Sequence, residues 1–301
     1  MIVCDDTPIR QDSRAVIDNI SNMIYYQFMK IYDIDNRIHD YRHLDWTESA
    51  VTSGTSGSLL KAREDRNKTR YYYKLSSYDP YRGIYGSECV NEIVACRLMN
   101  ILGIEHLQYK LIRALVSIGG KEHETWMCRS ENYRMFGERK IALDNFYEMN
   151  RKEGESPLDL CIRFGWKNTI YKMILVDYLI INRDRHGANI EVLRDVQGNM
   201  RLAPLFDNGL SFLAPLAGRD DRIKSFDPMD DVPANNFIGT RSLEHNLQLM
   251  EDIPLVDPIT LDSKETLLEG LDDILPDYYL EKIWQIIWNR WKHYEDFCYK
   301  K

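Results

Sequence analysis

Apolar residues recur along the 301-residue chain with two different periods, and these periods predict its elements. Where they return every two to four positions, one face of a helix is apolar and the other face is polar. In residues 87–102 this apolar stripe begins after Ser87, a suitable N-cap, and stops at Gly103, a residue type that ends many helices. Helices are predicted at 14–36, 87–102, 156–181 and 276–297.

Strands are predicted where short runs of β-branched and aromatic residues lie between turn residues. The charged tract 63–69, the pair Gly119-Gly120 and the pair Gln197-Gly198 are the candidate turns. Each turn joins two such runs, which predicts an antiparallel hairpin. The three predicted hairpins are 59–62 with 70–75, 107–118 with 124–129, and 190–193 with 200–203.

The order of these elements indicates the fold class. The first two hairpins and the helix 87–102 come early, whereas most helices follow residue 130. This order predicts an α+β chain with a mixed N-terminal lobe, built on an antiparallel sheet, and a mostly helical C-terminal lobe carrying the third hairpin. The predicted lobes are residues 1–130 and 131–301.

Composition narrows the possible partners and compartment. A net charge of -8 and a pI near 5.5 argue against direct nucleic-acid binding, which usually needs a basic face. The six cysteines include no Cys-x-x-Cys pair, which favours reduced thiols in the cytoplasm. The sequence begins without a signal-like segment, and no stretch approaches the roughly 20 apolar residues of a membrane span, so no membrane partner is expected.

Three oxygen-bearing side chains stand close to the third hairpin. Asp184 and Asn189 are five positions apart just before it, and Asp207 follows it. The first two have the spacing of the protein-kinase catalytic loop, in which an aspartate meets the attacking hydroxyl and an asparagine holds a metal ion. Asp207 would supply a second metal-binding carboxylate, since it emerges from an apolar run where an unpaired charge is costly. Such oxygen ligands suit Mg²⁺.

These loop residues also have structural interpretations. Asp184 and Asn189 are common turn residues, and His186 between them is more typical of a histidine that orients a loop than of a base. Arg183 and Arg185 flank the site, where either could contact a phosphate or a carboxylate, or face solvent. The combination with the downstream aspartate favours the catalytic interpretation.

A second group of residues could hold a nucleotide. Lys74 lies in a β-prone aromatic run, where it would either reach the phosphates of ATP or face solvent. Glu88 and Glu92, one turn apart on the next helix, are rival partners for it. Lys61 adds a further cation. A small-residue turn before these strands would present backbone N–H groups to phosphate oxygens or form an unliganded hairpin: Gly54, Thr55, Ser56, Gly57 and Ser58.

Together these residues resemble the HipA-like serine/threonine kinase family over roughly residues 50–300. That family has a small-residue phosphate loop, a strand lysine, a helix glutamate before a Leu-Gly-Ile step, an Asp-x-His-x-x-Asn loop and a Pro-Leu-Tyr-Asp motif. The corresponding positions here are 52–58, Lys74, Glu92, 184–189 and 204–207. The resemblance selects Glu92, whose distance to the Leu-Gly step matches the family. The phosphate loop departs from the family pattern, with Gly-Thr-Ser-Gly in place of Gly-Gly or Gly-Ala-Gln.

The resemblance implies a two-lobed, protein-kinase-like fold and a function. Family members use ATP with Mg²⁺ (or Mn²⁺) to phosphorylate serine or threonine of a protein, often including one of their own residues; in the turn these are Ser53, Thr55, Ser56 and Ser58. The implied catalytic residues are Asp184, Asn189 and Asp207, the last two holding metal. The implied nucleotide-binding residues are Lys74, Glu92, His186 and the turn 54–58.

The resemblance also suggests a partner. Some family members are toxins controlled by a DNA-binding antitoxin, so an antitoxin-like regulator is an expected partner. The chain looks more like the compact, free-standing members, because its phosphate loop lies too near its first residue for the full N-terminal subdomain of the longer toxins.

Two other functions would use similar residues. A small-molecule or lipid kinase shares the phosphate machinery, although the chain lacks a basic, apolar surface helix of the kind a lipid kinase uses at a membrane. A nucleotide-binding pseudokinase or toxin-like interaction module would be expected to lack the catalytic aspartate or a metal ligand, and all of these are present. The segment 237–242 looks ordered and has no assigned chemistry.

Overall fold

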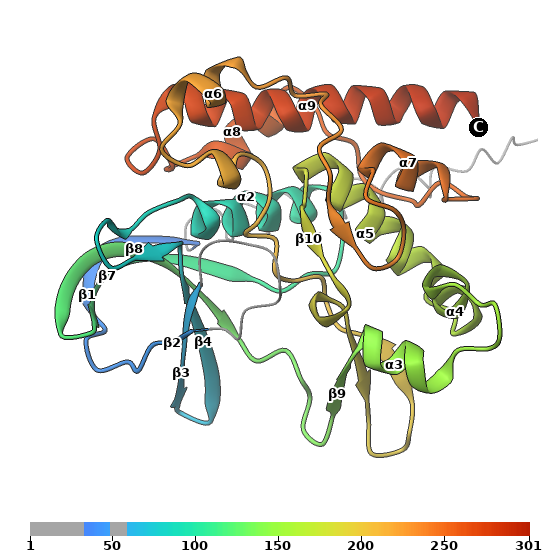
Figure 1. The fold of residues 1–301 in the computed structure, drawn as a ribbon, viewed down its shortest axis with the longest axis horizontal. Helices are drawn as coiled ribbons and strands as arrows, with labels where there is room; N and C mark the ends of the chain where they lie inside the picture. The colour runs from blue at the N-terminus through green and yellow to red at the C-terminus, as the bar shows by residue number, and fades with distance from the viewer. Residues whose placement is uncertain (1–32, 49–58) are drawn as a thin grey trace, which may run out of the picture.

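The computed structural model describes residues 33–48 and 59–301 (Figure 1). Within these residues the largest sheet has six strands in the order β1-β7-β8-β4-β3-β2. All neighbouring pairs are antiparallel except β1 with β7. The strands are β1 (Ile34–Asp40), β2 (Thr47–Glu48), β3 (Leu60–Arg66), β4 (Thr69–Leu75), β7 (Tyr109–Ile118) and β8 (Lys121–Glu131).

The turn of the first hairpin is shorter than its sequence pattern predicts. Strand β3 continues to Arg66 and β4 begins at Thr69, so Asn67 and Lys68 alone form the turn, with φ of 51° and 67°. The charged residues 63–66 are therefore the outer end of a strand, where cross-strand ion pairing with β4 stabilises them. The turn of the second hairpin, Gly119-Gly120, is as predicted.

Helix α2 (Glu88–Ile101) lies between the sheet and the C-terminal helices (Figure 1). Twelve of its 14 residues are buried, because it contacts β7 and β8 on one side and α5 and α8 on the other. The predicted helix 87–102 is thus confirmed to within one residue at each end. Ser87 stands at the N-cap position, but its hydroxyl hydrogen-bonds with the hydroxyl of Tyr279 at 2.6 Å rather than with the helix.

The remaining chain is mostly helical and carries a small sheet in the order β12-β11-β9. The predicted helix 156–181 is broken at Gly165, where φ is 81°, into α4 and α5. The predicted C-terminal helix is α9, which extends to Lys300. The helices are α3 (Leu143–Asn150), α4 (Pro157–Arg163), α5 (Lys167–Ile180), α6 (Asp220–Ser225), α7 (Leu243–Gln248), α8 (Ser263–Leu268) and α9 (Asp277–Lys300). The short strands are β5 (Tyr78–Asp79), β6 (Gly83–Ile84), β9 (Arg139–Ala142), β10 (Asp184–Arg185), β11 (Glu191–Arg194), β12 (Met200–Leu202) and β13 (Asn235–Asn236).

The predicted helix 14–36 is wrong at its C-terminal end. Residues from Ile34 onward form strand β1, because they pair in parallel with the edge of β7. The earlier part of that prediction, 14–32, lies outside the described residues, as does the glycine turn 52–58. In the described part of the chain, no helix is both long and apolar enough to cross a membrane.

Candidate active site

Lys74 connects three segments that are distant in sequence. The register of β4 pairs it with Lys61 of β3 and Cys128 of β8, on the face of the sheet that packs against α2. Its Nζ lies 3.0 Å from Glu92 Oε1 and 2.8 Å from Asp207 Oδ1. The strand lysine, the helix glutamate and the aspartate after β12 therefore meet at one point.

Glu92, rather than Glu88, is the helix partner of Lys74. Its second carboxylate oxygen accepts a hydrogen bond from the backbone N–H of Asn208 at 2.9 Å. Glu88, one turn earlier and also buried, instead accepts hydrogen bonds from the hydroxyl and backbone N–H of Ser77. The two glutamates, which the helical period leaves equivalent, therefore have different partners.

The opposite charges of Lys74 and Asp207 stabilise each other's ionised form. Burial by itself would lower the pKa of Lys74, but the carboxylates of Asp207 and Glu92 raise it well above its usual value. Burial would raise the pKa of Asp207, yet Lys74, Lys61 and Arg185 hold it well below its usual range. Lys74 is consequently a cation and Asp207 an anion at neutral pH. These are the charge states that bind a phosphate and a divalent cation.

Lys61 brings a second cation to the same carboxylate. Its Nζ lies 3.7 Å from Asp207 Oδ2, and it stands directly opposite Lys74 on the neighbouring strand. Opposed like charges destabilise a strand pair unless an anion lies between them, which is the position that Asp207 occupies. The predicted phosphate loop, 54–58, lies outside the described residues, and its role stays a prediction.

The backbone of Asp207 is in the left-handed region, with φ of 60°. This conformation is uncommon for a residue other than glycine and costs about 1 kcal/mol or more. Hydrogen bonds on both sides hold it in place. The hydroxyl of Tyr109 accepts the Asp207 backbone N–H at 3.4 Å, and the next N–H, of Asn208, is bound by Glu92. The conformation directs the carboxylate toward Lys74.

Asn91 fastens α2 to the segment that follows Asp207. Its side-chain nitrogen donates to the carbonyl oxygens of Gly209 and Ser211, both at 2.9 Å. Asn91 is fully buried, and its sequence signal is a polar residue between the apolar positions Val90 and Ile93 of the helix. Sequence reasoning missed it, although buried polar side chains usually have a specific partner.

Asp184 stands where α5 gives way to the loop. Ile181, with φ of 52°, ends the helix, and the side-chain oxygen of Asn182 accepts the Asp184 backbone N–H at 3.1 Å. The side-chain nitrogen of Asn189 donates to the carbonyl oxygen of Asp184 at 2.8 Å, which closes the loop across its characteristic spacing. Among the described residues the Asn189 amide oxygen has no hydrogen bond, so it is available to a metal.

A strand from much later in the chain positions the Asp184 carboxylate. Strand β13 runs parallel to β10, and Asn235 Nδ2 lies 3.3 Å from Asp184 Oδ1. The next residue but one, Phe237, donates its backbone N–H to the carbonyl oxygen of Arg185 at 2.9 Å. The segment 237–242 thus borders the candidate catalytic loop. Sequence reasoning missed Asn235, because nothing near it in the sequence points to Asp184.

Arg185 is fully buried, which excludes both a solvent-facing position and a role at a phosphate. It forms an ion pair with Asp177 of α5 at 2.8 Å. It also donates to the carbonyl oxygen of Phe206 and to the side-chain oxygen of Asn208, both at 2.7 Å. One guanidinium therefore joins the loop 184–189 to the residues on either side of Asp207, the candidate metal ligand. It fixes the two halves of the site relative to each other.

His186 has an orienting position beside the aspartate. Its Nδ1 accepts the backbone N–H of Ala188 at 3.2 Å, which caps the short 3₁₀ turn Gly187–Asn189. Its Nε2 lies 3.8 Å from Asp184 Oδ2. The ring therefore stabilises the turn that presents Asn189.

The donor set fits a hard divalent cation. Asp207 offers a carboxylate and Asn189 a carboxamide oxygen, the ligands that Mg²⁺ and Mn²⁺ prefer. Residues 33–48 and 59–301 contain no group of three or more His, Cys, Asp or Glu that could hold a metal by itself. A cation here would complete its coordination with phosphate oxygens and water, as Mg²⁺ commonly does.

Comparison with solved structures identifies the fold. The chain is similar to the Helicobacter pylori proinflammatory kinase CtkA, with a TM-score of 0.52 and 16% identity over 85% of this chain and 95% of that one. It is also similar to a chain of the Shewanella oneidensis toxin–antitoxin complex of HipA, HipB and operator DNA. That match has a TM-score of 0.43 and 14% identity over 100% of this chain and 75% of the other. No family model and no curated protein matches the sequence.

At these identities the likeness to CtkA concerns the fold alone. It confirms the predicted α+β fold and shows that the elements are arranged as in that kinase. The roles of the motif residues stay predictions.

Proposed function

We propose that this protein is an ATP- and Mg²⁺-dependent protein serine/threonine kinase of the HipA-like type. The observation that supports it most is the meeting of Lys74, Glu92 and Asp207 beside the loop that carries Asp184 and Asn189. An ion-pair network that only stabilises the fold would not need Asn189, whose amide oxygen has no hydrogen bond among the described residues. It would also not need Asp184, which Asn235 holds beside the same site.

The residues of the chain would divide the work of phosphoryl transfer. When bound, Mg²⁺ supplies charge neutralisation at the β- and γ-phosphates, and Asn189 with Asp207 would hold it. Lys74, oriented by Glu92, donates to phosphate oxygens, and Lys61 adds a second positive charge. In the structure described here, both lysines neutralise Asp207 instead. Nucleotide binding would therefore exchange these lysine contacts for phosphate contacts.

Asp184 would act on the acceptor. Asn235 engages one carboxylate oxygen, while the other faces His186. Asp184 orients the acceptor hydroxyl and takes its proton as the oxygen bonds to the γ-phosphorus and the bond to the ADP oxygen breaks. The proton then passes to solvent. The proposed acceptor is a serine or threonine of a protein, including the chain's own turn. An antitoxin-like regulator is proposed from the resemblance alone, and a cytoplasmic location from the cysteine pattern.

Transfer of labelled phosphate tests this proposal. The purified chain is incubated with Mg²⁺ and γ-labelled ATP, alone and with a peptide library containing serine, threonine and tyrosine, and phosphosites are mapped by mass spectrometry. We expect label on serine or threonine. Label should be absent from Asp184→Asn and Asp207→Asn variants that melt at the wild-type temperature.

The other outcomes are informative. Label found only on lipids or small molecules would identify another class of kinase. A thermal shift with MgATP but no transfer would identify a nucleotide-binding pseudokinase. Wild-type activity in either aspartate variant would refute the assignment of the site.

A further inference from the structure

Two neighbouring loops expose large apolar side chains at one end of the molecule. The loop before β9 carries Phe136, which is fully exposed, and Met135, which is 68% exposed. The turn between β11 and β12 carries Val196, which is 74% exposed. We call these loops, residues 134–138 and 195–199, the paired tips.

The paired tips form one continuous surface. A Cβ atom at Gly137 would lie 2.8 Å from Val196 Cγ1, so the two loops are in contact. Figure 1 shows both at the end of the small sheet, on the side of the molecule away from α9. Single apolar side chains are common on protein surfaces, whereas a contiguous group bordered by charges marks a binding surface.

A row of exposed side chains crosses the sheet next to the tips. Arg139 of β9 stands directly opposite Arg194 of β11, and Arg194 stands opposite Met200 of β12. Side chains of directly opposite residues lie on the same face of a sheet, and all three are exposed. Among the described residues neither arginine has an ion pair or a side-chain hydrogen bond. Two unpaired cations therefore lie side by side on this face.

The charge of this end of the molecule is opposite in sign to that of the whole chain. Residues 134–140 and 194–201 contain five Arg or Lys and two Asp or Glu, a net charge of +3, on a chain whose net charge is -8. Both carboxylates are already bonded: Glu138 pairs with Arg201 at 3.0 Å, and Asp195 accepts hydrogen bonds from its own turn. The partner that complements this surface is therefore anionic.

The size of the apolar surface distinguishes between kinds of partner. A specific protein interface takes about 20–30 residues from each side, whereas the paired tips with Met200 expose four large apolar side chains. Reversible binding to a membrane surface needs fewer. A few apolar side chains enter the boundary between headgroups and acyl chains, while nearby Arg and Lys attract anionic headgroups. The paired tips and the arginine row supply both parts.

We propose that the paired tips dock this protein on an anionic membrane surface. Phe136 and Met135 enter the lipid boundary, and Arg139 and Arg194 contact the headgroups. Such docking requires neither a membrane span nor an amphipathic helix, because two loops present the side chains. The proposal does not depend on the kinase function.

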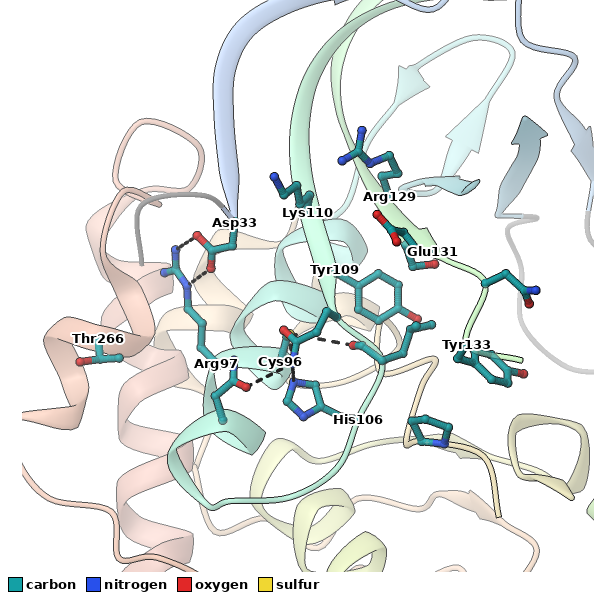
Figure 2. Close-up of a pocket in the computed structure, with 16 residues that line it drawn as sticks. Asp33, Cys96, Arg97, His106, Tyr109, Lys110, Arg129, Glu131, Tyr133 and Thr266 are labelled. Atoms are coloured by element: carbon teal, nitrogen blue, oxygen red, sulfur yellow. Dashed lines mark hydrogen bonds and ion pairs between the residues drawn. The ribbon is translucent and has the colours of Figure 1, made fainter. Parts of the chain in front are cut away.

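Docking in this way would bring the candidate active site close to the lipid surface. Tyr133, which Figure 2 shows at the edge of the cavity beside α2, precedes Phe136 by three residues. Three residues span at most roughly 11 Å. The ring of Tyr133 stacks on Phe206, the neighbour of Asp207, at a centroid distance of 5.9 Å.

Sedimentation with vesicles tests the proposal. The full chain is mixed with vesicles of phosphatidylcholine alone, or of phosphatidylcholine with phosphatidylglycerol. We expect binding to the anionic vesicles to be roughly tenfold tighter, the effect of one to two cations near a charged membrane. This preference should weaken as added salt screens the charges.

The apolar part is tested by Phe136→Ser, which should weaken binding to the anionic vesicles roughly tenfold, because less apolar surface leaves the water. Tyr81→Ser is the matched control: Tyr81 is 98% exposed on the turn between β5 and β6, and its loss should leave binding unchanged. Both variants should melt at the wild-type temperature. Equal binding by the two variants would overturn the insertion of Phe136.

The charged part is tested by Arg139→Gln with Arg194→Gln, which should remove most of the preference for phosphatidylglycerol. The control is Arg66→Gln with Lys68→Gln, at two exposed positions of the first hairpin, which changes the net charge equally and should keep the preference. An equal preference in both double variants would overturn the role of the arginine row.

Absence of wild-type binding to the anionic vesicles would overturn the proposal as a whole, and would assign the paired tips to a protein partner.

Discussion

Glu92 and Lys74 form a buried ion pair at 3.0 Å, and the second oxygen of the same carboxylate binds the backbone next to Asp207. One side chain on α2 therefore orients both the candidate phosphate-binding lysine and the candidate metal-binding segment. Contacts from β4, α2 and the segment 207–208 meet at this pair. A substitution of Glu92 is therefore a direct test of the site.

Glu92→Gln should lower kcat/KM for ATP by roughly 100-fold, because a preorganised charge at a phosphoryl-transfer site contributes several kcal/mol to the transition state. The free energy of unfolding should fall by about 1–3 kcal/mol, because glutamine keeps one acceptor but turns its NH₂ group toward the second buried donor, Lys74 or the Asn208 N–H. Steady-state kinetics and urea unfolding measure both quantities. Glu88→Gln is the matched control on the same buried helix, and an equal loss of activity in both variants would contradict the assignment.

Arg185→Met should lower the free energy of unfolding by about 3–5 kcal/mol, because it leaves the buried carboxylate of Asp177 without its partner. The double variant Arg185→Met with Asp177→Leu should recover part of this loss. Arg113→Met removes an ion pair with Glu124 whose partners are each 44% exposed, and should cost about 0–1 kcal/mol. Urea denaturation compares them, and similar values for the two arginine variants would disprove the structural role of Arg185.

Asn235→Ala should lower kcat roughly tenfold, less than the 100-fold or more expected of a lost catalytic base. The KM for ATP should stay unchanged, because Asn235 contacts the Asp184 carboxylate and none of the nucleotide residues. Asn145→Ala, at an exposed position of α3, is the control. An unchanged kcat in Asn235→Ala would show that the contact does not position the aspartate.

Stability should fall at alkaline pH partly through Cys161. Burial raises the pKa of this thiol from 9.0 to about 12, so the unfolded chain releases the proton at lower pH than the folded chain does. The corresponding stability is fully present below pH 9 and is lost as pH rises toward 12. At pH 10 the loss is on the order of 1 kcal/mol for one such thiol.

Cys161→Ala should remove that part of the pH dependence, which unfolding in reducing buffer between pH 8 and roughly pH 11 can measure. The variant also loses a fixed amount of packing energy, but this does not change with pH. Cys298→Ala, at a half-buried thiol, should alter the slope less. Parallel curves for the wild type and Cys161→Ala would count against the prediction.

Local sequence patterns were sufficient to predict the main helices and hairpins and to pick out the motif residues. Helix α2 and the hairpins follow from apolar spacing and turn residues, both of which act between close neighbours. The closeness of Asp184 and Asn189 in space could be predicted for the same reason, because their five-residue spacing allows a hydrogen bond across one short loop. The spacing of Asp207 from this loop is similarly short, with one hairpin between them.

Features set by distant contacts could not be predicted. The first residues of strand β1, 34–36, were interpreted as the end of a helix, because the pairing of this strand with β7 involves residues more than 70 positions away. Glu88 and Glu92 share a helix face, so the helical period could not choose between them; the family resemblance indicated Glu92, and this residue contacts Lys74 and the Asn208 N–H. Arg185 is surrounded in the sequence by polar loop residues, while its buried partners lie before and after that loop.

The attachments of α2 limit how this protein can be switched on or off. Ser87 binds Tyr279 of α9 at the start of the helix, Asn91 binds the 209–211 backbone along its middle, and Arg97 donates to carbonyl oxygens at 267 and 269. A helix anchored at all three levels cannot swing as a lever between an active and an inactive position without breaking buried bonds. Rearrangements that leave these bonds intact are therefore less costly, and loss of Tyr279 would disturb the start of the helix that orients Lys74.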